Sequence, residues 1–96
     1  MPYEIRYSSE AVEQLKKLRV FDRTAILDQV EQVLGVNPTV VSKSRVKRLH
    51  EPAPTQYRLR VGEFRVFYDV AEAEEVVLIV QVLSKQDSID YLGGSS

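Results

Sequence analysis

The chain has 96 residues, of which 44% are hydrophobic and 28% charged, and its net charge is −1. These values are typical of a single globular domain and exclude an intrinsically disordered chain. The absence of cysteine and the single histidine exclude disulfides, thiolate metal sites and histidine-based metal clusters. No cofactor is expected. With no long apolar run and no signal-peptide pattern, a soluble cytoplasmic protein without a membrane partner is expected.

The first predicted elements are a strand and two helices. Residues 3–7 alternate apolar and charged side chains, which is typical of a half-buried strand. A helix follows with Ser8 or Ser9 as its N-cap, and Asp22 is the predicted N-cap of a second helix. Gly35 ends this second helix. The short link between the helices predicts an antiparallel helical hairpin.

A long loop and a β-hairpin are predicted next. Residues 38–54 contain three prolines and are expected to be irregular, and long irregular segments of small domains are often functional. Strands over residues 57–61 and 64–70 flank a two-residue turn. Glycine at the first position of that turn, Gly62 followed by Glu63, fits a type II′ turn.

The last predicted elements are an aliphatic strand and a short helix. Residues 76–83 are nearly all β-branched or aliphatic, which favours a central strand covered on both faces. Ser84 is the predicted N-cap of the final helix, and residues 93–96 form a flexible tail. The order β-α-α-β-β-β-α predicts a single α+β domain over residues 1–92, with a small, mostly antiparallel sheet and the helical hairpin on one face.

The hairpin register places arginines opposite one another. A turn at Gly62 pairs Arg60 with Arg65, and like charges in that position destabilise a sheet. Alternation then puts one set of residues on the face away from the core: Arg58, Arg60, Arg65, Phe67 and Asp69. A bound phosphate would relieve the repulsion, and Phe67 could stack on a base. Solvated strand arginines paired with nearby acids are the alternative.

Positive charge is concentrated in the middle of the chain. Residues 43–65 contain seven Lys or Arg against two Glu, although the whole chain is nearly neutral. This distribution favours a local anion-binding face. The segment before the hairpin contributes four of these charges, which either form a solvated surface or contact an RNA backbone: Lys43, Arg45, Lys47 and Arg48.

The motif "YRLRVGEFRVFY", together with the "YEIRYSSEAVEQLKKL" opening and the aliphatic strand, resembles the RelE/ParE superfamily of type II toxin–antitoxin systems. The likeness covers nearly the whole chain. It implies a toxin, and for the RelE-like branch a ribosome-dependent mRNA endonuclease that cleaves in the A site and inhibits translation. Such enzymes use no metal, and the ribose 2′-oxygen attacks the adjacent phosphate.

The resemblance also implies roles for particular residues. Arg58 and Arg60 occupy positions where RelE-like toxins have lysines, and Arg65 matches an arginine of the family. Lys85 stands where an arginine usually follows the last strand, and Tyr91 matches a late catalytic tyrosine. In this comparison the cations stabilise the phosphate, Lys85 could donate a proton, and Tyr91, with a lowered pKa, could act as general base. Without the resemblance, Tyr91 would be an aromatic anchor of the last helix.

The resemblance implies partners and leaves alternatives. A RelB-like or other small DNA-binding antitoxin is expected, together with the ribosome and mRNA, and operator DNA only through the antitoxin complex. A ParE-like toxin that inhibits DNA gyrase without nuclease activity is the alternative function, since the chain is not strongly basic and "LSKQDSIDY" lacks a common RelE-like motif. A non-toxic binding module is a third possibility.

Overall fold

The structure, a computed structural model, describes residues 2–93. The predicted tail, residues 93–96, lies outside this range except for Gly93. The α+β class is confirmed, and the predicted order gains one short strand. In chain order the elements are β1 (Glu4–Tyr7), α1 (Ser9–Lys16), α2 (Val20–Gln29), η1 (Val30–Leu34), β2 (Val46–Arg48), β3 (Tyr57–Val61), β4 (Phe64–Ala71), β5 (Val76–Ser84) and α3 (Lys85–Tyr91).

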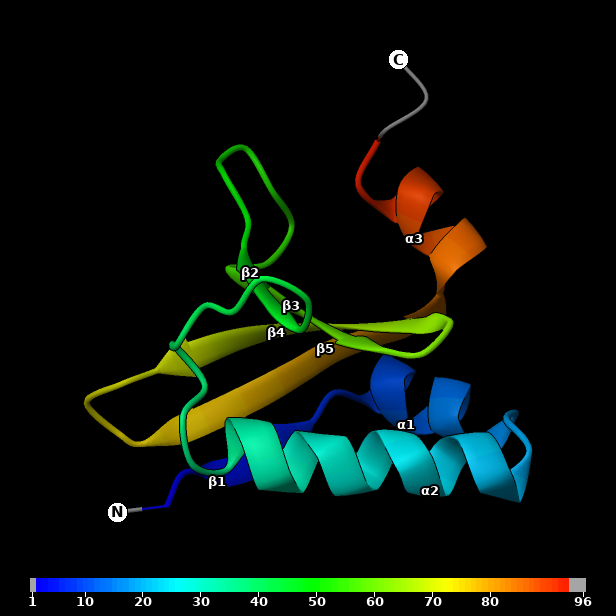
Figure 1. The fold of residues 1–96 in the computed structure, drawn as a ribbon, viewed down its shortest axis with the longest axis horizontal. Coiled ribbons are helices and arrows are strands. Elements are labelled where there is room, and N and C mark those ends of the chain that lie inside the picture. Colours follow the sequence, from blue (N-terminus) through cyan, green and yellow to red (C-terminus); the bar gives the residue numbers. More distant parts are fainter. Residues whose placement is uncertain (1, 94–96) are drawn as a thin grey trace.

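The five strands form one mixed sheet in the order β1-β5-β4-β3-β2. The β1–β5 pair is parallel, and the other three pairs are antiparallel. Figure 1 shows α1 and α2 on one side of the sheet and α3 on the other. The aliphatic strand β5 was predicted to be central, but β4 holds that position and β5 lies between β4 and β1. One face of the sheet is therefore covered by two helices, and the other is left to α3 alone.

The first two helices begin in different ways, α1 with a side-chain cap and α2 with an acidic residue in its first turn. Ser8 caps α1 as predicted, because its Oγ accepts from the Ala11 amide at 3.0 Å. The predicted cap at Asp22 is wrong: α2 begins at Val20, and Arg19 holds the N-cap position without a side-chain cap bond. Asp22 lies in the first turn instead, where the helix dipole stabilises its negative charge. Its carboxylate also accepts a hydrogen bond from Arg19 Nε at 3.2 Å.

A π-helical turn, η1, carries α2 to the predicted stop at Gly35. The Gly35 amide donates to the Val30 carbonyl at 3.2 Å, which closes the wider turn. A Cβ on Gly35 would lie 2.5 Å from the Glu31 carbonyl oxygen, so any larger residue would clash with the helix backbone. Because glycine has no Cβ, the chain can pass close to the Glu31 carbonyl where it leaves the helix.

The core lies between the sheet and the two N-terminal helices. Its buried side chains come from α1, α2, η1 and four of the five strands: Ala11, Leu15, Ile26, Val30, Leu34, Val46, Leu59, Val66, Tyr68, Val77, Ile79 and Val82. Three of these lie on β5, although Ile79 and Val82 are an odd number of residues apart. A bulge reconciles them, because Phe67 pairs with Gln81 and Tyr68 with Ile79, which leaves Val80 without a ladder partner.

The segment predicted to be irregular contains the edge strand β2. Val46 is 2% exposed and pairs with Leu59, while the Tyr68 hydroxyl donates to the Pro38 carbonyl at 2.6 Å. One buried valine among charged neighbours gives too little alternation to identify a strand from sequence. Pairing with β3 supplies what the local pattern lacks.

Candidate functional site

The hairpin has the predicted register. Arg60 pairs with Arg65 and Val61 with Phe64. Gly62 has a φ of +56° and Glu63 does not have a positive φ, which fits the predicted type II′ turn. The apolar side chains of the hairpin join the core as expected, so the arginines point to the opposite side of the sheet.

We call this side the arginine face and define it by Arg58, Arg60, Arg65 and Lys47. Lys47 belongs to it because it pairs directly with Arg58 across β2 and β3, and paired residues share a face of the sheet. The ion pairs found within residues 2–93 join other residues, so no carboxylate neutralises this cluster there. A group of cations without neighbouring carboxylates favours binding of an anion.

Arg58 is a half-buried cation of the face. Its Nε is buried and has no hydrogen-bond partner within the described chain. Burial lowers the pKa of Arg58, and repulsion from Arg65 and then Arg60 lowers it further. A guanidinium stays protonated at neutral pH even so, and the uncompensated charge favours binding of an anion.

Arg65 serves the turn as well as the face. It is 8% exposed, and its Nη1 donates to the Gly62 and Phe64 carbonyls at 3.0 Å each. These bonds hold the guanidinium close to the hairpin turn. Arg60, its cross-strand partner, is exposed and makes no side-chain hydrogen bond within residues 2–93. The two opposed arginines therefore differ: one is fixed and one is free to reach a ligand.

Phe67 is not available for base stacking, so that prediction is wrong. It is fully buried, and the Tyr91 ring packs on it edge-on, with centroids 4.9 Å apart and planes at 63°. The reason is tertiary: α3 folds over this end of the sheet. Tyr91 thus serves as the aromatic anchor of the last helix.

The expected lowering of the Tyr91 pKa is also wrong. Burial raises the pKa of Tyr91, and the carboxylates of Asp69 and Glu10 raise it further. The phenol lies near these acids, so it stays protonated at neutral pH. Alternation already placed Asp69 on this side of the sheet, but Glu10 lies on α1 and sequence spacing gave no sign of its proximity.

Lys85 lies at the turn end of the arginine face. It is the first residue of α3 and is exposed, while Ser84 caps the helix by accepting from the Asp87 amide at 3.0 Å. The Lys85 amide donates to the Glu63 carbonyl at 2.7 Å, which ties the start of α3 to the hairpin turn. Lys85 is therefore beside the turn that carries Arg60 and Arg65, and Tyr91 lies at the other end of α3.

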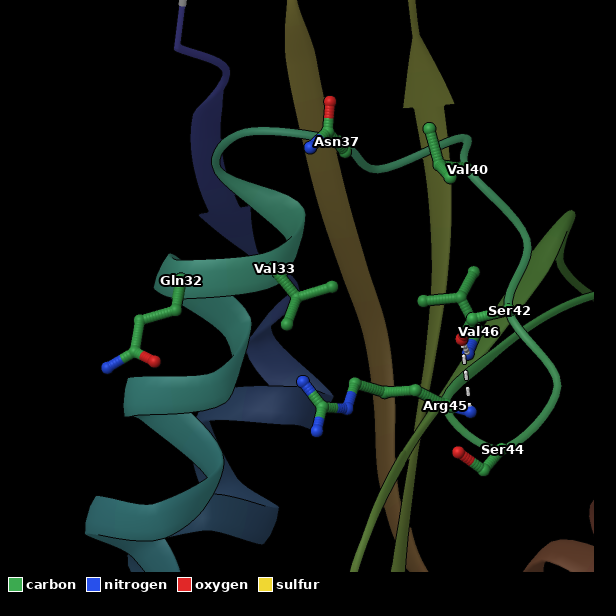
Figure 2. A pocket seen from close by; sticks show the side chains of 8 residues that line it. All are labelled: Gln32, Val33, Asn37, Val40, Ser42, Ser44, Arg45 and Val46. Carbon is green, nitrogen blue, oxygen red and sulfur yellow. Dashed lines mark hydrogen bonds between the residues drawn. The ribbon is translucent and has the colours of Figure 1, made fainter.

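The basic segment before the hairpin does not form one surface. Lys43, Arg45, Lys47 and Arg48 are all exposed, but alternation along β2 places Lys47 and Arg48 on opposite faces of the sheet. Arg48 lies over the Tyr57 ring, 4.9 Å from its centroid, on the core side of the sheet. Arg45 precedes β2, and its side chain extends toward Val33 on the helix side (Figure 2). Of the two cations on β2, Lys47 is the one that joins the arginine face.

Neither a metal centre nor a membrane span emerges from the described chain. Residues 2–93 contain no group of three or more His, Cys, Asp or Glu side chains that could hold a metal ion. None of the helices in that range has both the length and the apolar character to cross a bilayer. The arginine face is thus the strongest candidate site among these residues.

Comparisons with solved structures show the same fold in several toxins. The chain is similar to the Mycobacterium tuberculosis toxin–antitoxin complex RelBE2, with a TM-score of 0.76, 23% identity, and 88% of this chain and 99% of that chain covered. It is also similar to a Pyrococcus horikoshii RelE–RelB complex, with a TM-score of 0.72 and 24% identity, and the match covers 88% of this chain and 97% of that chain. A free Escherichia coli RelE variant matches with a TM-score of 0.71 and 22% identity, and the match covers 95% of this chain and 92% of that chain.

No curated protein sequence matches the chain significantly. The sequence model of one family does, and it is described as the ParE toxin of the type II toxin–antitoxin system parDE. Its match extends over residues 5–89, from β1 to α3, and so includes the hairpin and the arginine face. The chain therefore belongs to the ParE toxin family, within the RelE/ParE superfamily of type II toxin–antitoxin systems.

Proposed function

We propose that this toxin binds RNA phosphate on the arginine face and cleaves mRNA on the ribosome, and so inhibits translation in the cytoplasm. The observation that carries the proposal is the buried Nε of Arg58, which lies beside Arg60 and Arg65 and has no hydrogen-bond partner in the described part of the chain. A cluster of like charges held together without a carboxylate is suited to a polyanion. The similarity in fold to RelE toxins also supports binding of RNA at this face.

The proposed reaction needs no cofactor. The ribose 2′-hydroxyl loses its proton to water and its oxygen attacks the adjacent phosphorus. The bond from phosphorus to the 5′-oxygen breaks and that oxygen takes up a proton, so the products are a 2′,3′-cyclic phosphate and a 5′-hydroxyl. Arg58 and Arg60 would stabilise the charge that develops on the phosphorane oxygens. Arg65 would hold the turn and present its remaining N–H groups.

Lys85 and Tyr91 would act near the two ends of α3. Lys85, exposed beside the turn, would contact a neighbouring phosphate or the leaving group. Because its pKa is raised, Tyr91 would take part as a protonated phenol, a hydrogen-bond donor to the RNA, and not as the general base.

A reconstituted translation reaction tests this function. Purified protein should cut message only when translating ribosomes are present, with RNA 3′ ends mapped to the A site. Arg60→Ala should lower the cleavage rate by about 100-fold or more, the range seen when one electrostatic stabiliser is removed. Arg6→Ala, which removes an exposed arginine paired with Glu4 on β1, is the matched control. Intact message with well-folded protein would refute the proposal.

Gyrase inhibition is the second candidate function. It is favoured by the match to the ParE family and by Tyr91, whose ring packs on Phe67 and whose pKa is raised. This function predicts inhibited supercoiling or trapped DNA breaks with purified gyrase, and toxicity that survives Tyr91→Phe. Activity in the supercoiling assay together with intact message would select it over mRNA cleavage.

A further inference from the structure

A groove of about 400 Å³ lies on the helix side of the sheet, away from the arginine face. Figure 2 shows it between η1 and the loop that leads into β2. Its lining contains neither Asp nor Glu, and it offers mainly aliphatic and hydrogen-bonding groups. We call it the Arg45 groove and define it by six of its residues: Val33, Asn37, Val40, Ser42, Arg45 and Val46.

The Arg45 guanidinium extends across this groove toward Val33 (Figure 2). The backbone of Arg45 is fixed, since its amide donates to Ser42 Oγ at 3.2 Å and its carbonyl accepts from the Arg60 amide at 2.8 Å. The side chain is different: within residues 2–93 it has neither an ion pair nor a side-chain hydrogen bond. A positive charge is therefore held over the groove by a fixed backbone and lacks a counter-ion there.

The surroundings of the groove are unusually apolar for a surface loop. Val40, which lines the groove, is 58% exposed, and Val41, the next residue of the same loop, is 55% exposed. Exposed aliphatic side chains that gather in this way mark an interaction surface. A partner that satisfies both features must place a carboxylate on Arg45 and aliphatic side chains on the valines.

These features favour a peptide over RNA. No aromatic side chain lines the groove, so a base would have no ring on which to stack. Valine side chains offer nothing to a sugar or phosphate, whereas they match the aliphatic residues of an extended peptide. The arginine face, on the other side of the sheet, already offers the denser cluster of cations to a nucleic acid.

We propose that the Arg45 groove is a docking site for an acidic, aliphatic segment of the cognate antitoxin. A carboxylate of that segment accepts hydrogen bonds from the Arg45 guanidinium, with further donors at Asn37 and Ser42, while its aliphatic residues pack on Val33 and Val40. This site goes beyond the proposed function, because it depends on the toxin having an antitoxin and not on what the arginine face does.

Calorimetric titration of full-length toxin with full-length antitoxin tests the proposal. Arg45→Glu should raise the Kd by about 10-fold or more, and the effect should shrink at high salt. Lys43→Glu makes the same charge change in the same loop outside the groove lining, and should raise the Kd by less than about threefold. Both variants should keep the wild-type Tm, since the backbone hydrogen bonds at position 45 do not involve its side chain.

A second measurement identifies the occupant. A photo-reactive amino acid at Val40 should crosslink to an antitoxin peptide that contains Asp or Glu, and changing that acid to Lys should restore binding to Arg45→Glu. Equal Kd values for Arg45→Glu and Lys43→Glu would overturn the proposal. So would Arg45→Glu weakening single-stranded RNA binding while antitoxin affinity stays unchanged. Loss of mRNA cleavage does not enter either measurement, so the two proposals fail separately.

Discussion

The two faces of the sheet meet different demands. On the helix side, α1, α2 and η1 cover a continuous set of buried aliphatic side chains, and even the Tyr68 hydroxyl has a partner in the Pro38 carbonyl. On the other side, α3 covers Phe67 but leaves Arg60 exposed and the buried Arg58 Nε without a hydrogen-bond partner among residues 2–93. The buried Tyr68 hydroxyl on the helix side is hydrogen-bonded, whereas the buried Arg58 Nε on the other side has no partner within the described residues. Selection for stability alone would not favour the arginine face, because like charges opposite one another destabilise a sheet.

The largest effect of a single substitution should come from the core face. Leu59→Ala removes a fully buried side chain from β3, and we expect the free energy of unfolding to fall by about 2–5 kcal/mol. Denaturant unfolding followed by circular dichroism measures this loss. A change below 1 kcal/mol would mean that the core closes around the cavity, and the contrast between the faces would weaken.

A smaller loss should follow from Tyr68→Phe. This change keeps the ring stacked on Tyr57 but leaves the buried Pro38 carbonyl without its hydrogen bond. The free energy of unfolding should fall by about 1–3 kcal/mol. Tyr57→Phe, on the partner ring, is the control and should change stability less, since no side-chain hydrogen bond of Tyr57 is present among residues 2–93.

On the arginine face the sign should reverse. Arg60→Thr removes a like charge directly opposite Arg65, so the free energy of unfolding should stay unchanged or rise by about 0.2–1 kcal/mol. The same variant should weaken RNA binding and flatten its salt dependence. A clear loss of stability in the same unfolding assay would show that Arg60 supports the fold, which would remove the contrast on which the proposed site rests.

The smallest effect concerns pH. Burial raises the pKa of Tyr91 above its ordinary value of 10.0, so the folded state holds the phenolic proton more tightly than the unfolded state. Its contribution to stability is therefore full below about pH 10 and is lost as the pH rises through the folded pKa. Above about pH 10, the free energy of unfolding should fall less steeply with pH for Tyr91→Phe than for the wild type, as measured by denaturant unfolding at a series of alkaline pH values. Identical slopes for the two proteins would contradict this assignment.

Local pattern was enough to predict the hairpin, and contacts between distant elements were what it missed. Arg60 opposite Arg65 follows from alternation and a glycine turn, and the structure has that register. The burial of Phe67, the raised pKa of Tyr91 and the split of the basic segment depend on where α3, α1 and β2 pack. Spacing along one chain segment does not contain that information.

The bulge at Val80 has a consequence for how this fold tolerates changes in length. Val80 has no partner in the β4–β5 ladder, and its carbonyl accepts from Ser8 Oγ at 2.7 Å where the chain passes from β1 into α1. Deleting Val80 would restore an unbroken ladder and keep Ile79 and Val82 on the core side, because the remaining spacing would be even. The arginine face would keep its orientation, and only the attachment of α1 would have to adjust. This is a position where one residue can be lost without changing which side chains the toxin presents.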